Sequence, residues 1–118
     1  FAELTAGLPR RQLNLLVQLR TNHIPLQFYL ARISKADVAT CPTCGGVPET
    51  VAHFLLSCPT YTLHRAVHYR PLGFSGLNLK TLLNSKDALR PLFDYVNATG
   101  RLRVVFGALE LPDDDGDG

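Results

Sequence analysis

The feature that most constrains this sequence is the segment "CPTCGGVPETVAHFLLSC" at residues 41–58, which contains all three cysteines of the chain and one of its four histidines. Their spacing is Cys-x2-Cys-x8-His-x4-Cys, and Gly45 and Gly46 suit a tight knuckle because glycine takes positive φ without strain. Three thiolates and one imidazole form the Cys₃His set that Zn²⁺ takes in closed tetrahedral sites. The spacing therefore predicts one zinc ion bound by Cys41, Cys44, His53 and Cys58.

Other uses of the three cysteines fit the sequence less well. A redox-active Cys-x-x-Cys motif is expected in a βαβ context, whereas this segment continues into an apolar helix. A structural disulfide would leave an odd thiol, and the opening "FAELTAGLPRRQ" lacks the pattern of a secretory signal. Three buried free thiols are the remaining alternative. Because protein side chains would fill all four positions, the predicted zinc site is structural and not catalytic.

Helical periodicity and frequent breakers predict a mainly α, small zinc-stabilised helical domain with a Cys-x2-Cys knuckle. Eight prolines and nine glycines in 118 residues favour short elements, and this length suffices for one domain with a single core. Helices are expected at residues 9–20, 26–33, 48–57, 60–70, 78–85 and 86–99, and 101–111 is expected to be a strand or an extended tail.

Two of these helices have a predicted buried face. In the first, Leu13, Leu16 and Val17 follow helical spacing, and polar residues gather on the opposite side. The helix at 86–99 is expected to end at Gly100. Its apolar stripe comprises Leu89, Leu92, Phe93 and Val96.

The charge of the chain is unevenly distributed. The net charge is +2, but four of the ten acids lie in residues 111–118, so residues 1–110 carry six acids against twelve Lys and Arg, a net +6. We therefore expect a basic zinc-binding helical domain at 1–110, with its knuckle at 41–58, and an acidic disordered tail at 111–118. No apolar run approaches the roughly 20 residues needed to span a membrane. The first residue is Phe1, which suggests a fragment of a longer protein.

Several short motifs together resemble a known family. They read "RTNHIPLQ", "ARISKAD", "CPTC", "ETVAH" and a final "CP", and "LLNSKDALRPLFDYVNATGRL" follows them. They are similar to the region downstream of the ribonuclease H domain in fungal LINE-like (non-LTR) retrotransposon polyproteins, and the likeness covers about residues 8–103. The sequence departs from the family at Asn22 and Ser34, where the family has Gly, at Gln27, where it has Asn, and at Ala31, where it has His. Asn tolerates the left-handed conformation that a Gly at position 22 would supply.

The resemblance implies a zinc-binding module at the C-terminal end of a reverse transcriptase polyprotein. Such a module would help hold template RNA or target DNA, beside the upstream reverse transcriptase and ribonuclease H domains, in the nucleus or cytoplasm. The chain has no paired-Asp polymerase motif, so we expect no enzyme activity of its own. Basic residues near the predicted zinc site are the candidate phosphate contacts. They are Arg10, Arg11, Arg20, Arg32, Lys35 and Arg65.

Two further interpretations involve other functions or residues. A zinc-stabilised protein-interaction domain, a domesticated remnant without nucleic-acid contact, is the main alternative. A small hydrolase using His23, His53 or His64 with Asp37 or Asp87 is disfavoured, because no nucleophile–base pair is indicated and His53 is assigned to the metal. Instead, His23 is expected to hydrogen-bond the backbone in the turn before Pro25. Tyr61 and Tyr69 are expected to be packing residues more than base-stacking ones.

Overall fold

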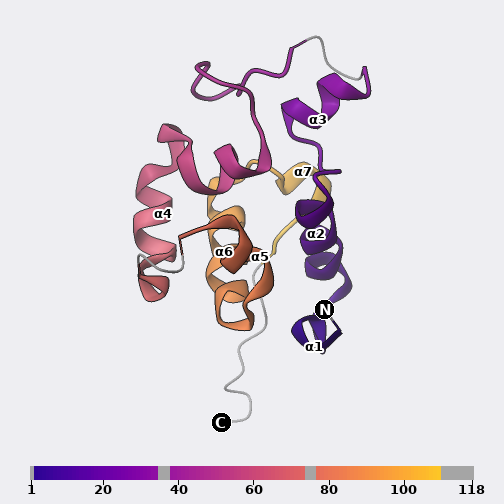
Figure 1. The fold of residues 1–118 in the computed structure, drawn as a ribbon, viewed down its shortest axis with the longest axis vertical. Helices are drawn as coiled ribbons and strands as arrows, with labels where there is room; N and C mark the ends of the chain where they lie inside the picture. The colour runs from indigo at the N-terminus through magenta and orange to yellow at the C-terminus, as the bar shows by residue number, and fades with distance from the viewer. Residues whose placement is uncertain (1, 35–37, 74–76, 110–118) are drawn as a thin grey trace.

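Helices make up the regular structure of this protein. The computed structural model describes residues 2–34, 38–73 and 77–109, and within these ranges it contains no strand, only an isolated antiparallel bridge between Thr40 and Pro48 (Figure 1). The mainly α prediction is therefore confirmed. The elements in chain order are α1 (Ala2–Thr5), α2 (Arg10–Thr21), α3 (Gln27–Arg32), the π-helical turn η1 (His53–Ser57), the 3₁₀ turn η2 (Pro59–Tyr61), α4 (Thr62–His68), the 3₁₀ turn η3 (Arg70–Leu72), α5 (Leu79–Asn84), α6 (Lys86–Thr99) and α7 (Arg103–Phe106).

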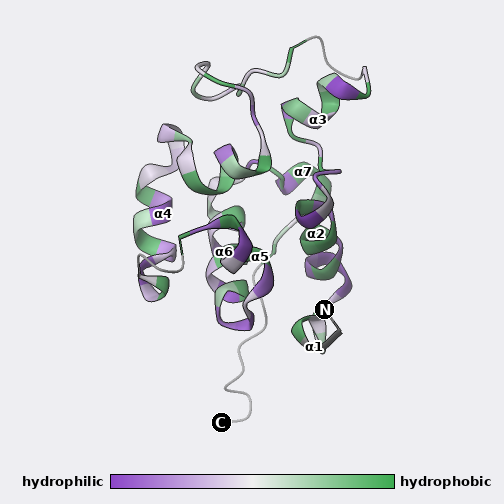
Figure 2. Cartoon of the chain, in the orientation of Figure 1, coloured by the Kyte–Doolittle hydropathy of each residue, from purple (hydrophilic) through white to green (hydrophobic). Residues whose placement is uncertain are grey.

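The helix α6 forms the centre of the fold, in contact with α4 and α5 (Figure 1). Its predicted apolar stripe is confirmed, since Leu89, Leu92, Phe93 and Val96 are all buried. Burial of each such side chain contributes about 1.5–3 kcal/mol. The helix ends where predicted, at Gly100 with φ 69° in the left-handed region. Both α2 and α6 contain hydrophobic and hydrophilic residues, as expected of helices with one buried and one exposed face (Figure 2).

The buried face of α2 differs from the predicted one. Leu15, Leu16 and Leu19 are buried, whereas Val17 is 40% exposed and Leu13 only half-buried. The reason is the C-terminal segment, which packs against the other side of the helix. Gln12 is buried there and its Nε2 donates a hydrogen bond to the Leu109 carbonyl oxygen at 2.9 Å.

Residues 101–109 form neither of the two structures expected from the sequence. They contain the short helix α7 and then return along α2. Leu102, Phe106 and Leu109 are buried, and the Leu109 N–H donates to Asn97 Oδ1 at 3.1 Å. Through these three side chains the segment contributes to the hydrophobic core. The predicted acidic tail at 111–118 lies outside the described residues. Among the helices that the structure describes, none has the length and hydropathy of a membrane span.

The knuckle lies at one end of the helical body, next to α3 (Figure 1). The helical turn η1, which follows the knuckle, is hydrogen-bonded to α6, because the Tyr95 hydroxyl donates to the Phe54 carbonyl oxygen at 2.6 Å. Tyr61 and Tyr69 pack around the same ring, with centroids 6.3 and 4.9 Å from that of Tyr95. Both are buried, in agreement with their prediction as packing residues.

Candidate metal centre

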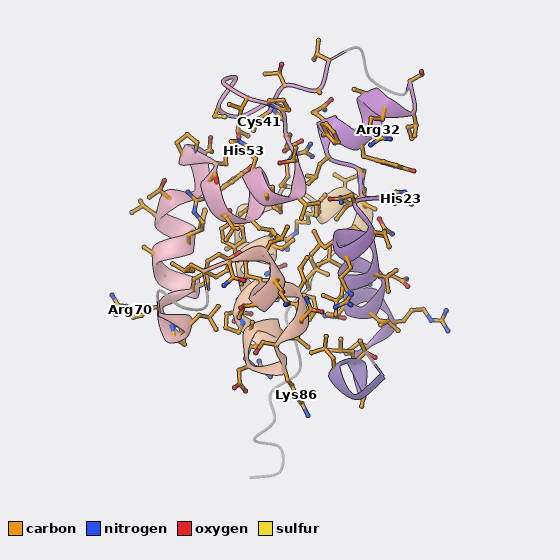
Figure 3. The ribbon with its side chains drawn as sticks, in the orientation of Figure 1. His23, Arg32, Cys41, His53, Arg70 and Lys86 are labelled. Carbon is orange, nitrogen blue, oxygen red and sulfur yellow. The ribbon has the colours of Figure 1, made fainter. Side chains whose placement is uncertain are left out.

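The four predicted metal ligands lie together in the folded chain. The Sγ atoms of the three cysteines and a ring nitrogen of His53 all lie within 4.8 Å of one another. The three thiols are free. Cys41, Cys58 and His53 are buried and Cys44 is half-buried, and Figure 3 shows Cys41 and His53 close together at the knuckle end of the molecule. The residues therefore form one candidate metal site, as their spacing predicts.

Two distances within the cluster match those of a tetrahedral thiolate site. With metal–sulfur bonds of about 2.3 Å and a metal–nitrogen bond of about 2.0–2.1 Å, tetrahedral zinc places two sulfurs about 3.8 Å apart and a sulfur and nitrogen about 3.6 Å apart. Here Cys41 Sγ and Cys58 Sγ are 3.8 Å apart, and Cys44 Sγ and His53 Nε2 are 3.4 Å apart. The remaining separations, up to 4.8 Å, require a contraction of about 1 Å to reach the same tetrahedron. The residues fit a four-coordinate metal ion.

Backbone hydrogen bonds shape the knuckle that carries Cys41 and Cys44. The Cys41 N–H donates to the Val47 carbonyl at 2.8 Å, and the Gly45 N–H donates to the Cys41 carbonyl at 2.9 Å. Gly45 has φ 69°, as predicted, but Gly46 does not have positive φ. The turn directs both thiols toward the following helix.

The helix after the knuckle begins later than the sequence indicates. Pro48 and Glu49, expected in its first turn, are not helical, and helical structure starts at Val51. The last part is a π-helical turn in which the Cys58 N–H donates to the His53 carbonyl at 2.7 Å. Single π-helical turns often occur at functional sites. Here the turn joins two of the four ligands directly.

Hydrogen bonds favour the thiolate form of two cysteines. Burial raises the pKa of the Cys58 thiol, but hydrogen bonds from the Thr43 side chain and from Thr60 outweigh it and lower the pKa to about 7. At Cys41 burial also raises the pKa, and hydrogen bonds from Thr43 and the Cys44 backbone reverse the direction. Thiolates are the form that binds metals.

The pKa of Cys44 moves in the opposite direction. A backbone hydrogen bond from Gly46 lowers it, but burial and the adjacent Cys41 together raise it above its usual value. Repulsion between neighbouring thiolates raises a thiol pKa, and such crowding is expected where three thiolates surround one ion. A cation at the centre would offset this repulsion.

Glu49, the first residue of the "ETVAH" motif, is a buried carboxylate four residues before His53, and the sequence did not predict its structural role. Its carboxylate is fully buried and accepts hydrogen bonds from Arg101 Nε at 2.7 Å, Arg101 Nη2 at 2.6 Å and the Gln27 N–H at 2.8 Å. Its backbone N–H donates to the Ala39 carbonyl. The only local signal was an acidic residue within an apolar segment, and nothing in the sequence indicated Arg101 as its partner.

The predicted nucleic-acid contacts form two groups. Arg10, Arg11 and Arg20 belong to α2, and Arg65 belongs to α4, on the other side of α6 (Figure 1). Several of them contact the fold: Arg11 donates to the Ala108 carbonyl, Arg20 to the Leu83 carbonyl and Asn84 Oδ1, and Arg65 to the Tyr95 hydroxyl.

The other two candidates belong to the α3 end of the molecule. Arg32 is exposed at the end of α3, and Figure 3 places it at the same end as Cys41 and His53. Lys35 lies outside the described residues.

Two histidines outside the cluster, His23 and His64, each pack against a tyrosine ring. Within the described residues the imidazole of His23, expected to hydrogen-bond the backbone, stacks on the Tyr29 ring, with centroids 5.2 Å apart and an interplanar angle of 27°. The ring of His64 packs against that of Tyr61, with centroids 6.2 Å apart.

The fold and the cluster define a small helical domain with a Cys₃His metal-binding site. No protein-family model, curated protein or solved structure matches the chain.

Proposed function

We propose that Cys41, Cys44, His53 and Cys58 bind one structural zinc ion. The observation that carries this proposal is the donor set itself: three sulfurs and one nitrogen, with two of their separations at 3.8 and 3.4 Å. Zinc prefers this set, whereas Mg²⁺ and Ca²⁺ prefer oxygen ligands. With four protein ligands the coordination sphere is closed, which supports a structural role and a chain that does not catalyse a reaction itself.

The function proposed for the domain is nucleic-acid binding, as part of the C-terminal region of a retrotransposon reverse transcriptase polyprotein. Two backbone conformations support this resemblance. Asn22 and Ser34 are the two non-glycine positions with positive φ, 64° and 62°, among the described residues. They are also the two positions at which the resembled family has Gly. A family whose fold needs left-handed backbone at these turns would have this pattern.

Charge gives the proposal its physical mechanism. Residues 1–110 carry a net +6, and Arg10, Arg11 and Arg32 are exposed. Binding of phosphates by such residues releases counterions, so affinity falls steeply as salt rises. The domain would thus hold template RNA or target DNA mainly through the backbone, while the upstream domains of the polyprotein act on it.

Salt-dependent binding of a labelled single-stranded RNA and a labelled DNA duplex tests this function. We expect binding at about 50 mM salt that weakens by orders of magnitude toward 200 mM. The double substitution Arg10→Ala and Arg32→Ala should weaken binding and reduce the slope for single strands by about 0.7 for each phosphate that the variant no longer neutralises. Val104→Ala, at a side chain that is 99% exposed, is the matched surface control. Absence of binding at 50 mM salt would exclude the proposal.

An interaction with another protein is the second candidate, and one surface favours it. Leu63 and Val67 lie four residues apart on α4 and are 80% and 65% exposed. Residues at this spacing share one helix face. If a protein partner co-purifies, is lost on Leu63→Ser and Val67→Ser substitution, and no nucleic acid binds at 50 mM salt, the domain is an interaction module.

A further inference from the structure

A cavity lies between the C-terminal end of α2 and α3, and none of its described lining residues is a predicted metal ligand. Its volume is about 460 Å³, within the range of about 300–1,000 Å³ typical of small-molecule sites. Apart from Ile33, the described side chains that line it are aromatic, polar or cationic, and none is acidic. They include Thr21, Asn22, His23, Phe28, Tyr29 and Arg32.

Two rings at this cavity are stacked but accessible. The His23 and Tyr29 centroids are 5.2 Å apart with an interplanar angle of 27°. His23 is exposed and Tyr29 is half-buried, and neither belongs to the hydrophobic core. An accessible, nearly parallel ring pair offers a surface on which a planar heterocycle can stack. Such stacking accepts any nucleobase, because every base has a π-face.

A cation lies at the same cavity. The Arg32 guanidinium is 5.9 Å from the centroid of the Phe28 ring, which holds it at the surface, and no carboxylate of the described residues forms an ion pair with it. Guanidinium groups bind phosphate oxygens through two parallel hydrogen bonds. Figure 3 shows Arg32 and His23 on the same edge of the molecule, so a ligand that stacks at His23 can extend toward Arg32.

The backbone of this region is held in an unusual conformation. Asn22 ends α2 in the left-handed region, with φ 64° and ψ 11°. The His23 N–H donates to the Thr21 hydroxyl at 3.4 Å, which fixes the turn that presents the imidazole. The Asn22 amide at the cavity has both a donor and an acceptor, the groups needed at the edge of a nucleobase.

From these features we infer that the cavity binds one nucleotide of a single-stranded nucleic acid. The base stacks on the His23–Tyr29 pair, and its phosphate binds Arg32. This inference rests on the proposed function only for the polymer, because a free nucleotide has the same chemistry. It assigns base stacking to the α2–α3 turn, separate from the metal centre and from the other basic residues.

The test measures affinity of the zinc-loaded full chain for a fluorescent single-stranded RNA and for an abasic strand of the same length. We expect His23→Ala and Tyr29→Leu each to weaken binding of the RNA about tenfold at about 50 mM salt, the loss of one stacked base. Their slope against salt and their affinity for the abasic strand should equal those of the wild type. His68→Ala, the same substitution on α4, is the matched control, and zinc content and thermal unfolding verify folding of each variant.

A second measurement separates this inference from the proposed function. Adenosine monophosphate is titrated into the full chain while the ring resonances of His23 and Tyr29 are followed by NMR. Ring shifts that disappear in Arg32→Ala, together with RNA binding, support both proposals. RNA binding with unchanged affinity in the ring variants overturns the inference and leaves the proposed function standing. Ring shifts without RNA binding show a free-nucleotide site and exclude the nucleic-acid function. If there are no ring shifts and no RNA binding, both proposals are excluded.

Discussion

Removal of Arg101 should destabilise this domain more than removal of any exposed cation. The Arg101→Met substitution leaves the Glu49 carboxylate, which is 0% exposed, without the two hydrogen bonds of 2.7 and 2.6 Å that pair its charge. An unpaired buried charge costs about 3–5 kcal/mol. Domains of this kind have a total stability of about 5–15 kcal/mol, so the loss is a large share. At about 4 °C per kcal/mol, the midpoint of thermal unfolding should fall by about 12–20 °C.

Thermal and urea unfolding at pH 7 in excess zinc measure this loss. Arg103→Met, an exposed arginine two residues further along the chain, is the control and should change stability by less than about 0.5 kcal/mol. The double substitution Glu49→Leu and Arg101→Met should recover part of the loss, because it removes the buried charge together with its partner. If Arg101→Met lies within about 1 kcal/mol of the wild type, Glu49 does not depend on this pair and the reasoning is refuted.

Three other substitutions test separate parts of the structure. Burial raises the pKa of Tyr95 to about 12, above the usual value of about 10, so its contribution is present below pH about 10 and is lost as the pH rises through 12. Tyr95→Phe should therefore reduce the decline in unfolding free energy between pH 9 and pH 12, measured with urea, by up to about 2.7 kcal/mol; an unchanged decline would contradict this assignment. Cys44→Ser should leave amides of the knuckle unprotected from hydrogen exchange even in excess zinc, and wild-type protection would refute a structural metal. Leu92→Ala, at a fully buried position of α6, should cost about 2–5 kcal/mol in urea unfolding, and a cost below about 1 kcal/mol would remove α6 from the centre of the core.

The sequence was most informative where local patterns decide the structure. The stripe of α6 repeats at helical spacing and the helix ends at a glycine, so its buried face and its end at Gly100 were both predictable. The metal ligands were predictable for a similar reason, because Cys41, Cys44, His53 and Cys58 lie within one short segment and their chemistry restricts the alternatives.

The errors arose where distant segments decide the outcome. The α2 sequence contains leucines on more than one face, and the return of Leu109 onto Gln12 determines which of them are buried. The segment "RVVF" is rich in β-branched residues, which favour strands, yet it forms α7, which follows the buried Leu102 and ends with the buried Phe106. Glu49 and Arg101 are 52 residues apart, and no local pattern connects them. Propensity was misleading only for "RVVF"; for α2 and for the Glu49–Arg101 pair, contacts between distant segments decided the outcome.

The central claim is that one ion is held by three thiolates and an imidazole, and native mass spectrometry of the purified chain tests it most directly. We expect a mass increase of one zinc ion per chain, with all three cysteines reduced, and loss of the metal on Cys44→Ser or His53→Ala substitution. A chain that carries no zinc and has a Cys41–Cys44 disulfide would contradict it.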